Sequence, residues 1–217
     1  MGEAIFLSAS APDPKRAPQY AATADIVAIT AAVSALVYVI LGRRPLIWGG
    51  HPAITPMVWV VAQDVDVDYG RWVRLYQSEY FEDKFPDDNA RFQNVTFTPS
   101  VEGDREGSLK LMRQRMFSEH RFAAAVFIGG MGGIVEEFDL FSEAQPEAAV
   151  VPVISTGGGV LEVGARIGKI PPELTDERDY VALFHRQLGI SPREERFRTP
   201  ELQPTNASDR FWRPQVT

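Results

Sequence analysis

Short apolar runs alternate with longer segments of helical periodicity along most of the chain. The short runs are mainly apolar and bounded by Gly, Pro or polar residues, which is typical of strands buried on both faces. They are residues 5–10, 46–48, 73–76, 95–97, 123–128 and 150–154. The longer segments predict helices. They are residues 26–41, 57–63, 109–120, 134–143 and 179–188. This alternation predicts an α/β protein, a three-layer Rossmann-like fold with a central mostly parallel sheet.

The change in character near residue 190 divides the chain into two expected parts. Residues 1–190 carry the alternating pattern and predict one ligand-binding domain, a size that suits a single α/β unit. Residues 191–217 are polar and contain several prolines, so they predict a polar C-terminal tail. Phe211 and Trp212 are expected to pin that tail onto the domain or onto a partner.

One apolar segment needs an explanation of its own. Residues 26–41 read IVAITAAVSALVYVIL without a charge, and Arg43 and Arg44 follow. The run is shorter than the roughly 20 residues that span a bilayer. We therefore expect no membrane insertion but a helix buried on most of its surface, at a subunit contact of a homo-oligomer. Asp25 is the expected N-cap and Gly42 the expected stop.

The composition of the chain argues against several kinds of partner and site. The net charge is −7, and no basic stripe appears, so nucleic acid is not an expected partner. The chain has no Cys, which excludes disulfides and thiolate metal sites and favours a cytoplasmic location. The three His residues are far apart in sequence, so we expect no metal site. No cofactor is expected either.

The most informative stretch is residues 123–141, which read AAAVFIGGMGGIVEEFDLF. A buried strand runs into a glycine turn, and the helical pattern begins directly after it. Glycines allow positive φ and a close approach of a ligand to the backbone. The first N–H groups of the helix form an anion site together with the helix dipole. We therefore expect a phosphate to bind at Gly129, Gly130, Met131, Gly132 and Gly133.

This stretch resembles the signature of the Lonely Guy (LOG) family and of the wider SLOG superfamily, P-G-G-x-G-T-x-x-E. Gly129, Gly130, Gly132 and Glu136 fall on its fixed positions. The sequence departs from the pattern twice, with Ile128 in place of Pro and Gly133 in place of Thr. The register selects Glu136 as the functional carboxylate, and Glu137 is its rival if the helix begins later.

LOG enzymes also carry an Arg on the helix before the motif. Arg113 occupies that place here, within LMRQRM, and Arg115 is close enough to compete for the role. The resemblance implies hydrolysis of the N-glycosidic bond of a nucleoside monophosphate, with Glu136 and Arg113 as catalytic residues. LOG-like proteins are commonly dimers or larger, so it also implies a homo-oligomer.

Two other functions stay open. SLOG relatives bind nucleotide signals, including NAD-derived ones, in bacterial defence systems without cleaving them. Such a sensor would use the same residues and would need an effector partner. A nucleoside deoxyribosyltransferase-like enzyme would share the architecture and a catalytic Glu. In each case the expected partner is a small-molecule nucleotide.

Further glycine and hydroxyl residues follow other predicted strands. Ser8 and Ser10 end the first strand, Gly49, Gly50 and His51 follow the second, and Thr156 and Gly157 follow the last. The carboxyl ends of parallel strands meet at one edge of a sheet. We therefore expect these residues to line one crevice with the central glycine turn.

Overall fold

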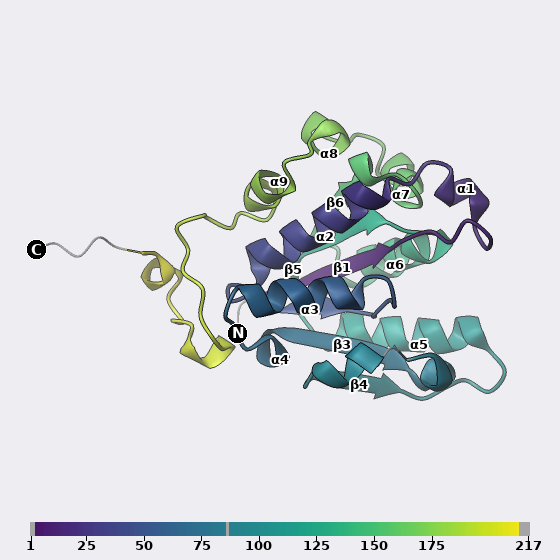
Figure 1. The fold of residues 1–217 in the computed structure, drawn as a ribbon, viewed down its shortest axis with the longest axis horizontal. Helices are drawn as coiled ribbons and strands as arrows, with labels where there is room; N and C mark the ends of the chain where they lie inside the picture. The colour runs from purple at the N-terminus through teal and green to yellow at the C-terminus, as the bar shows by residue number, and fades with distance from the viewer. Residues whose placement is uncertain (1–2, 86, 213–217) are drawn as a thin grey trace, which may run out of the picture.

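Six parallel strands form the single sheet at the centre of the computed structural model, which describes residues 3–85 and 87–212 (Figure 1). The strands are β1 (Ala4–Ser10), β2 (Leu46–Trp48), β3 (Val73–Ser78), β4 (Val95–Thr98), β5 (Phe122–Gly129) and β6 (Ala149–Val153). Their order is β4-β3-β2-β1-β5-β6, and all five pairings are parallel. The predicted three-layer Rossmann-like fold is confirmed, with a sheet that is parallel throughout.

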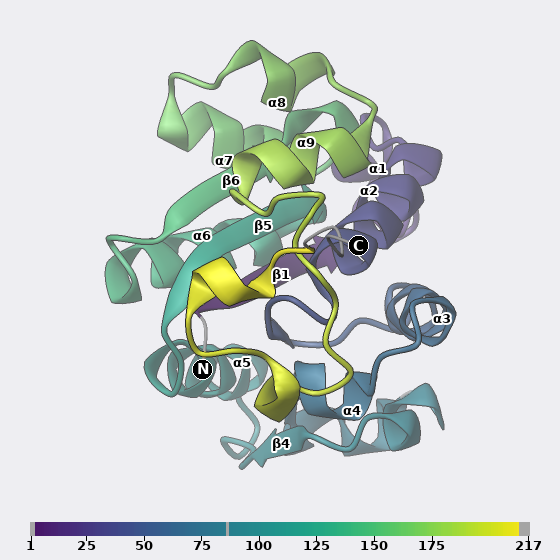
Figure 2. The same cartoon turned by 90° about the vertical axis from the view of Figure 1, so that its left-hand side faces the viewer.

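Helices cover both faces of the sheet, as Figure 2 shows for α5 and α6 on one side and α2 and α3 on the other. The first face carries α5 (Arg105–Ser118), α6 (Gly132–Ala144) and α7 (Val160–Ile167). The second face carries α2 (Ile26–Ile40), α3 (Thr55–Asp64) and α9 (Tyr180–Gln187). Each face has its own apolar core, because alternate residues of a buried strand point to opposite sides. Phe6, Phe117 and Phe141 pack together on the first face.

Several short helices complete the chain. The α-helical ones are α1 (Pro18–Ala21), α4 (Tyr69–Trp72) and α8 (Pro172–Asp176). The 3₁₀ helices are η1 (Glu79–Lys84), η2 (Asp87–Arg91), η3 (Ile154–Thr156), η4 (Pro200–Leu202) and η5 (Ala207–Arg210). The single-turn pieces have too few residues for an apolar periodicity to be recognised, so the sequence pattern does not reveal them.

The apolar helix α2 lies inside the protein. Asp25 caps it as predicted, because its carboxylate accepts a hydrogen bond from the Ala28 N–H at 2.9 Å. The helix packs between the sheet, α3 and α9, and only a narrow stripe that includes Val27 and Tyr38 is exposed. Within the described residues, no helix is both long and apolar enough to cross a bilayer.

The start of α5 differs from the prediction. The sequence suggests Ser108 as the cap after an acidic loop, but α5 begins at Arg105 with Asp104 as its N-cap. The Asp104 carboxylate accepts from the Gly107 N–H at 2.9 Å. Ser108 is buried inside the first turns, and its hydroxyl accepts from the Val101 N–H at 2.8 Å. Both residues are good caps, and local sequence alone does not choose between them.

The segment after α9 crosses the sheet at the amino ends of its strands (Figures 1 and 2). Glu194 accepts two hydrogen bonds from Arg44, at 2.6 and 3.1 Å, and its side chain is 4 % exposed. The carbonyl of Phe197 accepts from the Trp72 indole N–H at 3.0 Å. The Phe197 N–H donates to the Gly42 carbonyl at 2.8 Å. These bonds hold the segment on the edge opposite the crevice described below.

A partly buried polar cluster near the end of α5 predicts how stability depends on pH. The Tyr76 hydroxyl donates to Glu119 at 2.6 Å and lies 2.7 Å from Nε2 of His120. Burial, followed by the nearby positive charge of Arg74, lowers the pKa of His120 below its ordinary value. The unfolded chain therefore takes up a proton at His120 first, near pH 6.5. This contribution to stability is full above about pH 6.5 and is lost as the pH falls below it.

We expect His120→Gln to flatten the dependence of the unfolding free energy on pH between 7 and 5. Urea unfolding at a series of pH values measures this, and the other two histidines are present in both proteins, so their contributions cancel. An unchanged slope in the variant would contradict the assignment.

Candidate functional site

The carboxyl ends of β1 and β5 lie side by side where the strand order reverses. From β1 the sheet continues to β2, β3 and β4 on one side, and to β5 and β6 on the other. Ser8 pairs with Phe127, and Ser10 with Gly129, in the register of β1 and β5. Open α/β sheets bind ligands in the crevice outside such a switch point. The topology therefore places Ser10 and the glycine turn where a ligand is expected.

The turn between β5 and α6 is fixed by the backbone. The Gly130 N–H donates to the Ser10 carbonyl at 2.8 Å, which ties the turn to β1. Gly129 and Gly130 have φ of +63° and +85°. A Cβ on Gly129 would lie 2.5 Å from Cδ1 of Ile29. Glycine is therefore required here both by the backbone conformation and by the lack of space.

The two residues expected from the end of β6 lie behind this turn. Thr156 is completely buried, and its hydroxyl accepts from the Gly129 N–H at 2.9 Å while it donates to the Val153 carbonyl at 2.6 Å. Gly157 is buried against the backbone of Thr23. Both residues brace the glycine turn from its buried side.

The amino end of α6 opens at the crevice. Its N-cap, Met131, provides no side-chain hydrogen bond, and the N–H groups of Gly132 and Gly133 precede the first intrahelical donors. An anion binds well at such a position. A Cβ on Gly132 would lie 3.6 Å from the hydroxyl oxygen of Tyr20, so the Tyr20 hydroxyl is near this end. Burial, and then a hydrogen bond to Glu162, raises the pKa of Tyr20.

Arg113 joins α5 to the first turns of α6. Its side chain is 6 % exposed. Its Nη1 donates to Glu136 Oε2 at 2.7 Å, its Nε to Glu137 Oε1 at 3.2 Å, and its Nη2 to the Gly133 carbonyl at 3.3 Å. One guanidinium therefore holds both carboxylates and the helix backbone, as its fixed fork of donors allows.

The two carboxylates differ in their surroundings. The Glu137 side chain is 18 % exposed, and its Oε2 accepts a hydrogen bond from the Ser8 hydroxyl at 2.5 Å. Ser8 itself is 3 % exposed. The Glu136 side chain is 59 % exposed, and among the described residues its Oε1 has no hydrogen-bond donor. Glu137 is thus fixed on both oxygens, whereas Glu136 keeps one oxygen available to a ligand or to water.

The rival arginine lies elsewhere. Arg115 donates from Nε to Glu119 at 2.7 Å and from Nη1 to the carbonyl of Phe97 at 3.2 Å. Its side chain is 43 % exposed. The structure therefore brings Arg113, and not Arg115, to the carboxylates.

The residues after β2 form the next part of the crevice edge. Gly49 accepts a hydrogen bond at its carbonyl from the Gln77 side chain at 3.1 Å, and a Cβ on Gly50 would collide with the same amide. Gln77 lies within β3, one residue before its end, because the strand extends two residues beyond the predicted range 73–76. His51 follows, partly buried; burial, and then the positive charge of Arg16, lowers its pKa. Arg16 thus lies near enough to His51 to add positive charge at this edge.

Among the described residues, no group of three or more His, Asp or Glu is arranged to hold a metal ion. The sequence also left two features of the site unrecognised. Tyr20 is one, because a tyrosine in a short helix after a Pro-rich loop gives no signal. The Ser8–Glu137 hydrogen bond is the other, because it joins residues from opposite ends of the domain.

Comparison with known proteins supports the same region. A sequence model of the SLOG cluster3 family matches residues 19–188. The match includes Arg113, both carboxylates and the whole glycine turn, and it begins after β1. No curated protein matches the chain.

Proposed function

The chain belongs to the SLOG cluster3 family, and from this we propose that its crevice binds a nucleotide with a phosphorylated ribose and hydrolyses the N-glycosidic bond. One observation carries the proposal. A half-exposed carboxylate, Glu136, is fixed by a buried guanidinium, Arg113, within the first turns of a helix whose amino end is open to an anion.

The phosphate is expected at the amino end of α6. Gly132 and Gly133 supply N–H donors there, and the helix dipole adds partial positive charge. The donors of Arg113 are directed at Glu136, Glu137 and the helix backbone. We therefore assign the phosphate grip to the backbone and give Arg113 the task of positioning the carboxylates.

The ribose then extends from the phosphate toward the carboxylates. Cleavage of an N-glycosidic bond develops positive charge on the sugar, and a carboxylate nearby stabilises that charge. Glu136 accepts a proton from a water molecule whose oxygen bonds to the anomeric carbon. The bond from that carbon to the base nitrogen breaks, its electron pair stays with the base, and solvent protonates the base.

Glu137 and Ser8 support the site without contacting the ligand. The Ser8 hydroxyl and Arg113 each hold one oxygen of Glu137. Glu137 holds Arg113 at Nε while Nη1 holds Glu136, so the orientation of the reacting carboxylate depends on residues that do not touch the ligand. Such support from neighbouring side chains keeps a site close to its productive geometry.

We expect Glu136→Gln to lower base release by about 10²–10⁴-fold, because it removes the general base. Glutamine keeps the size of the side chain and an oxygen for Arg113, so nucleotide binding should persist. Free-base release from nucleoside monophosphates, NAD and ADP-ribose is followed chromatographically, and binding is followed by the shift in melting temperature.

Exposed Glu143, at the far end of α6, offers the matched control. Glu143→Gln makes the same chemical change away from the crevice and should leave base release unaltered. Equal activity of Glu136→Gln and the wild type would disprove the assigned role.

A second candidate function rests on a specific observation. Arg113 has its Nε, Nη1 and Nη2 groups occupied, and Gly133 removes the hydroxyl that the LOG pattern has at that position. Both features suit a SLOG-type sensor that binds a nucleotide signal without cleaving it and passes the signal to an effector partner. A melting shift with every ligand recovered intact would favour this function, and homo-oligomer formation is compatible with either.

A further inference from the structure

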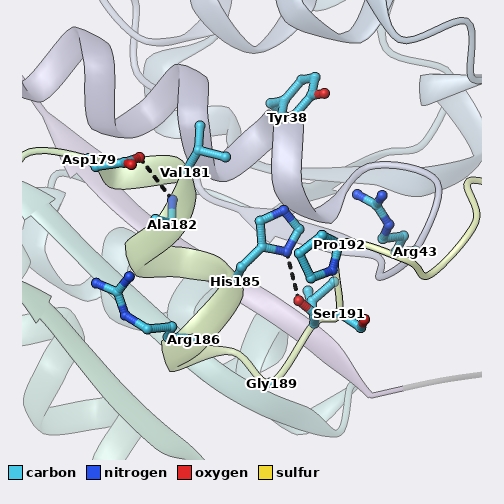
Figure 3. Close-up of a pocket in the computed structure, with 11 residues that line it drawn as sticks. Tyr38, Arg43, Asp179, Val181, Ala182, His185, Arg186, Gly189, Ser191 and Pro192 are labelled. Atoms are coloured by element: carbon cyan, nitrogen blue, oxygen red, sulfur yellow. Dashed lines mark hydrogen bonds between the residues drawn. The ribbon is translucent and has the colours of Figure 1, made fainter.

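A pocket lies at the carboxyl end of α2, away from the carboxyl ends of the strands. Its volume is about 690 Å³, it is open to solvent on one side, and α2, α9 and the chain after α9 line it (Figure 3). Asp25, at the other end of α2, donates its N–H to the carbonyl of Thr156 beneath the glycine turn. Since α2 has 15 residues, and a helix rises 1.5 Å per residue, about 20 Å separate the two regions.

The inner wall of the pocket contains a buried cation. Arg43 is 7 % exposed, and its Nε and Nη1 donate to the carbonyls of Glu194 and Val39 at 2.8 and 2.9 Å. Its third nitrogen, Nη2, has no hydrogen-bond partner among the described residues. Both partners of Arg43 are neutral carbonyls, so its charge is not neutralised by direct contact.

The surrounding charges increase this imbalance. The Glu194 carboxylate is already bound by Arg44, which donates to both of its oxygens. Arg196 adds a further cation, with its guanidinium carbon 4.5 Å from the centre of the Tyr38 ring. Arg44 and Arg196 therefore both add positive charge close to Arg43. Burial, and then the charge of Arg196, lowers the pKa of Arg43 to about 10, and the charge of Glu194 opposes this shift.

Asp179, whose carboxylate accepts from the Ala182 N–H at 3.0 Å, and Arg186 also line the pocket, and the rest of the lining is mainly apolar. Val181, Ala182, Ile190 and Pro192 contribute to it. Figure 3 shows the Tyr38 ring on one side of the pocket and the His185 imidazole on the other. Nδ1 of His185 is 2.6 Å from the Ile190 carbonyl, which orients the imidazole. A ligand for this pocket therefore needs an apolar body as well as a negative charge.

We propose that this pocket is a second ligand site, for a compact molecule that joins one anionic group to an apolar ring. The anionic group, a phosphate or a carboxylate, contacts the Nη2 of Arg43, and the ring lies between Tyr38 and the apolar wall of α9. An anion here is favourable because it neutralises a desolvated cation, an interaction stronger than one at an exposed charge. The site is separate from the crevice and does not depend on the function proposed for it.

The test is a titration of the full chain with phenyl phosphate, followed through the NMR signals of its three histidine rings. His185 lines the pocket, His51 follows β2, and His120 belongs to the polar cluster near the end of α5. We expect a saturable shift of the His185 signals, with a midpoint distinct from any shift of His51 and with His120 unchanged. A His185 signal that does not move would overturn the proposal.

Variants identify the contacts. Arg43→Met should weaken the effect on His185 by at least about tenfold, since a hydrogen bond to a charged group contributes about 1.5–3 kcal/mol. Because Arg43 also holds the chain after α9, Tyr38→Ala provides an independent variant at a half-exposed side chain, with an expected loss of roughly fivefold. Exposed Arg178, paired with Asp25, is the control, and Arg178→Met should bind as the wild type does.

Two outcomes would count against the site. Wild-type affinity in both Arg43→Met and Tyr38→Ala would show that the assigned contacts are wrong. Equal affinity for inorganic phosphate and phenyl phosphate would show that the apolar wall contributes nothing, which contradicts the proposed ligand class. Weaker binding of inorganic phosphate, and comparable binding of benzoate, would support it.

Discussion

Replacing Arg113 by methionine is expected to destabilise the protein by about 3 kcal/mol and to lower base release, because Arg113 positions the Glu136 carboxylate. Removing one partner of a buried ion pair leaves the other charge without compensation, and such losses reach 3–5 kcal/mol. Here two carboxylates, Glu136 and Glu137, lose their shared cation at once. Glu136 is half exposed and regains water, so the lower end of that range applies.

Urea unfolding measures the loss, and Arg115→Met is the matched control. Arg115 lies two residues away on α5, in an exposed pair with Glu119. Exposed pairs of this kind contribute about 0.2–1 kcal/mol, so the control should remain near wild-type stability. Equal losses in the two variants would contradict the distinction that the structure draws between the two arginines.

A double variant separates charge from packing. If the cost of Arg113→Met comes from the uncompensated Glu137 carboxylate, then Arg113→Met/Glu137→Gln should regain part of the lost stability. Glutamine removes the negative charge and still offers an oxygen to the Ser8 hydroxyl. If the losses of stability from the two substitutions add in the double variant, the cost of Arg113→Met comes from poor packing of the methionine side chain and not from the charge of Glu137.

The strands of this protein could be predicted from sequence because each is a short apolar run with a clear end. The six runs correspond to β1 through β6, and the boundaries differ by at most two residues. Helix starts were harder, since Asp104 and Ser108 both suit an N-cap. The short helix α4 has a single turn and therefore no periodicity to recognise.

For the site, sequence identified the residue types but not the partners. The glycine turn and Arg113 follow from local pattern and resemblance. By contrast, the roles of Glu136 and Glu137 depend on β1 and α5, which lie far away in the chain, and only the fold shows that Ser8 holds Glu137. Thr156 looked like a crevice residue, because a strand end and a hydroxyl suggest one. The structure shows that its hydroxyl serves the backbone of Gly129.

The second large effect is expected at Gly157, which supports the glycine turn from behind. Its φ is +64°, and a Cβ there would lie 1.9 Å from the carbonyl oxygen of Thr23. Because that oxygen belongs to the backbone, a side-chain rotation cannot relieve the contact. The chain before α2, or the loop that carries Thr156, would have to move.

Gly157→Ala should therefore destabilise the protein by about 2–5 kcal/mol, the sum of about 1–2 kcal/mol for the left-handed backbone and 1–3 kcal/mol for overpacking. Gly189→Ala is a close control, since Gly189 has φ of +62° and no atom within 4 Å of its Cβ position. It should carry the backbone cost alone. The difference in unfolding free energy between the two variants, measured by urea unfolding, gives the cost of the contact with Thr23. Because the neighbouring Thr156 holds Gly129, Gly157→Ala should also weaken nucleotide binding. Gly189→Ala should leave nucleotide binding unchanged. Equal losses of stability in the two variants would show that the backbone moves and relieves the contact with Thr23. Gly157 would then be required only for its left-handed backbone conformation.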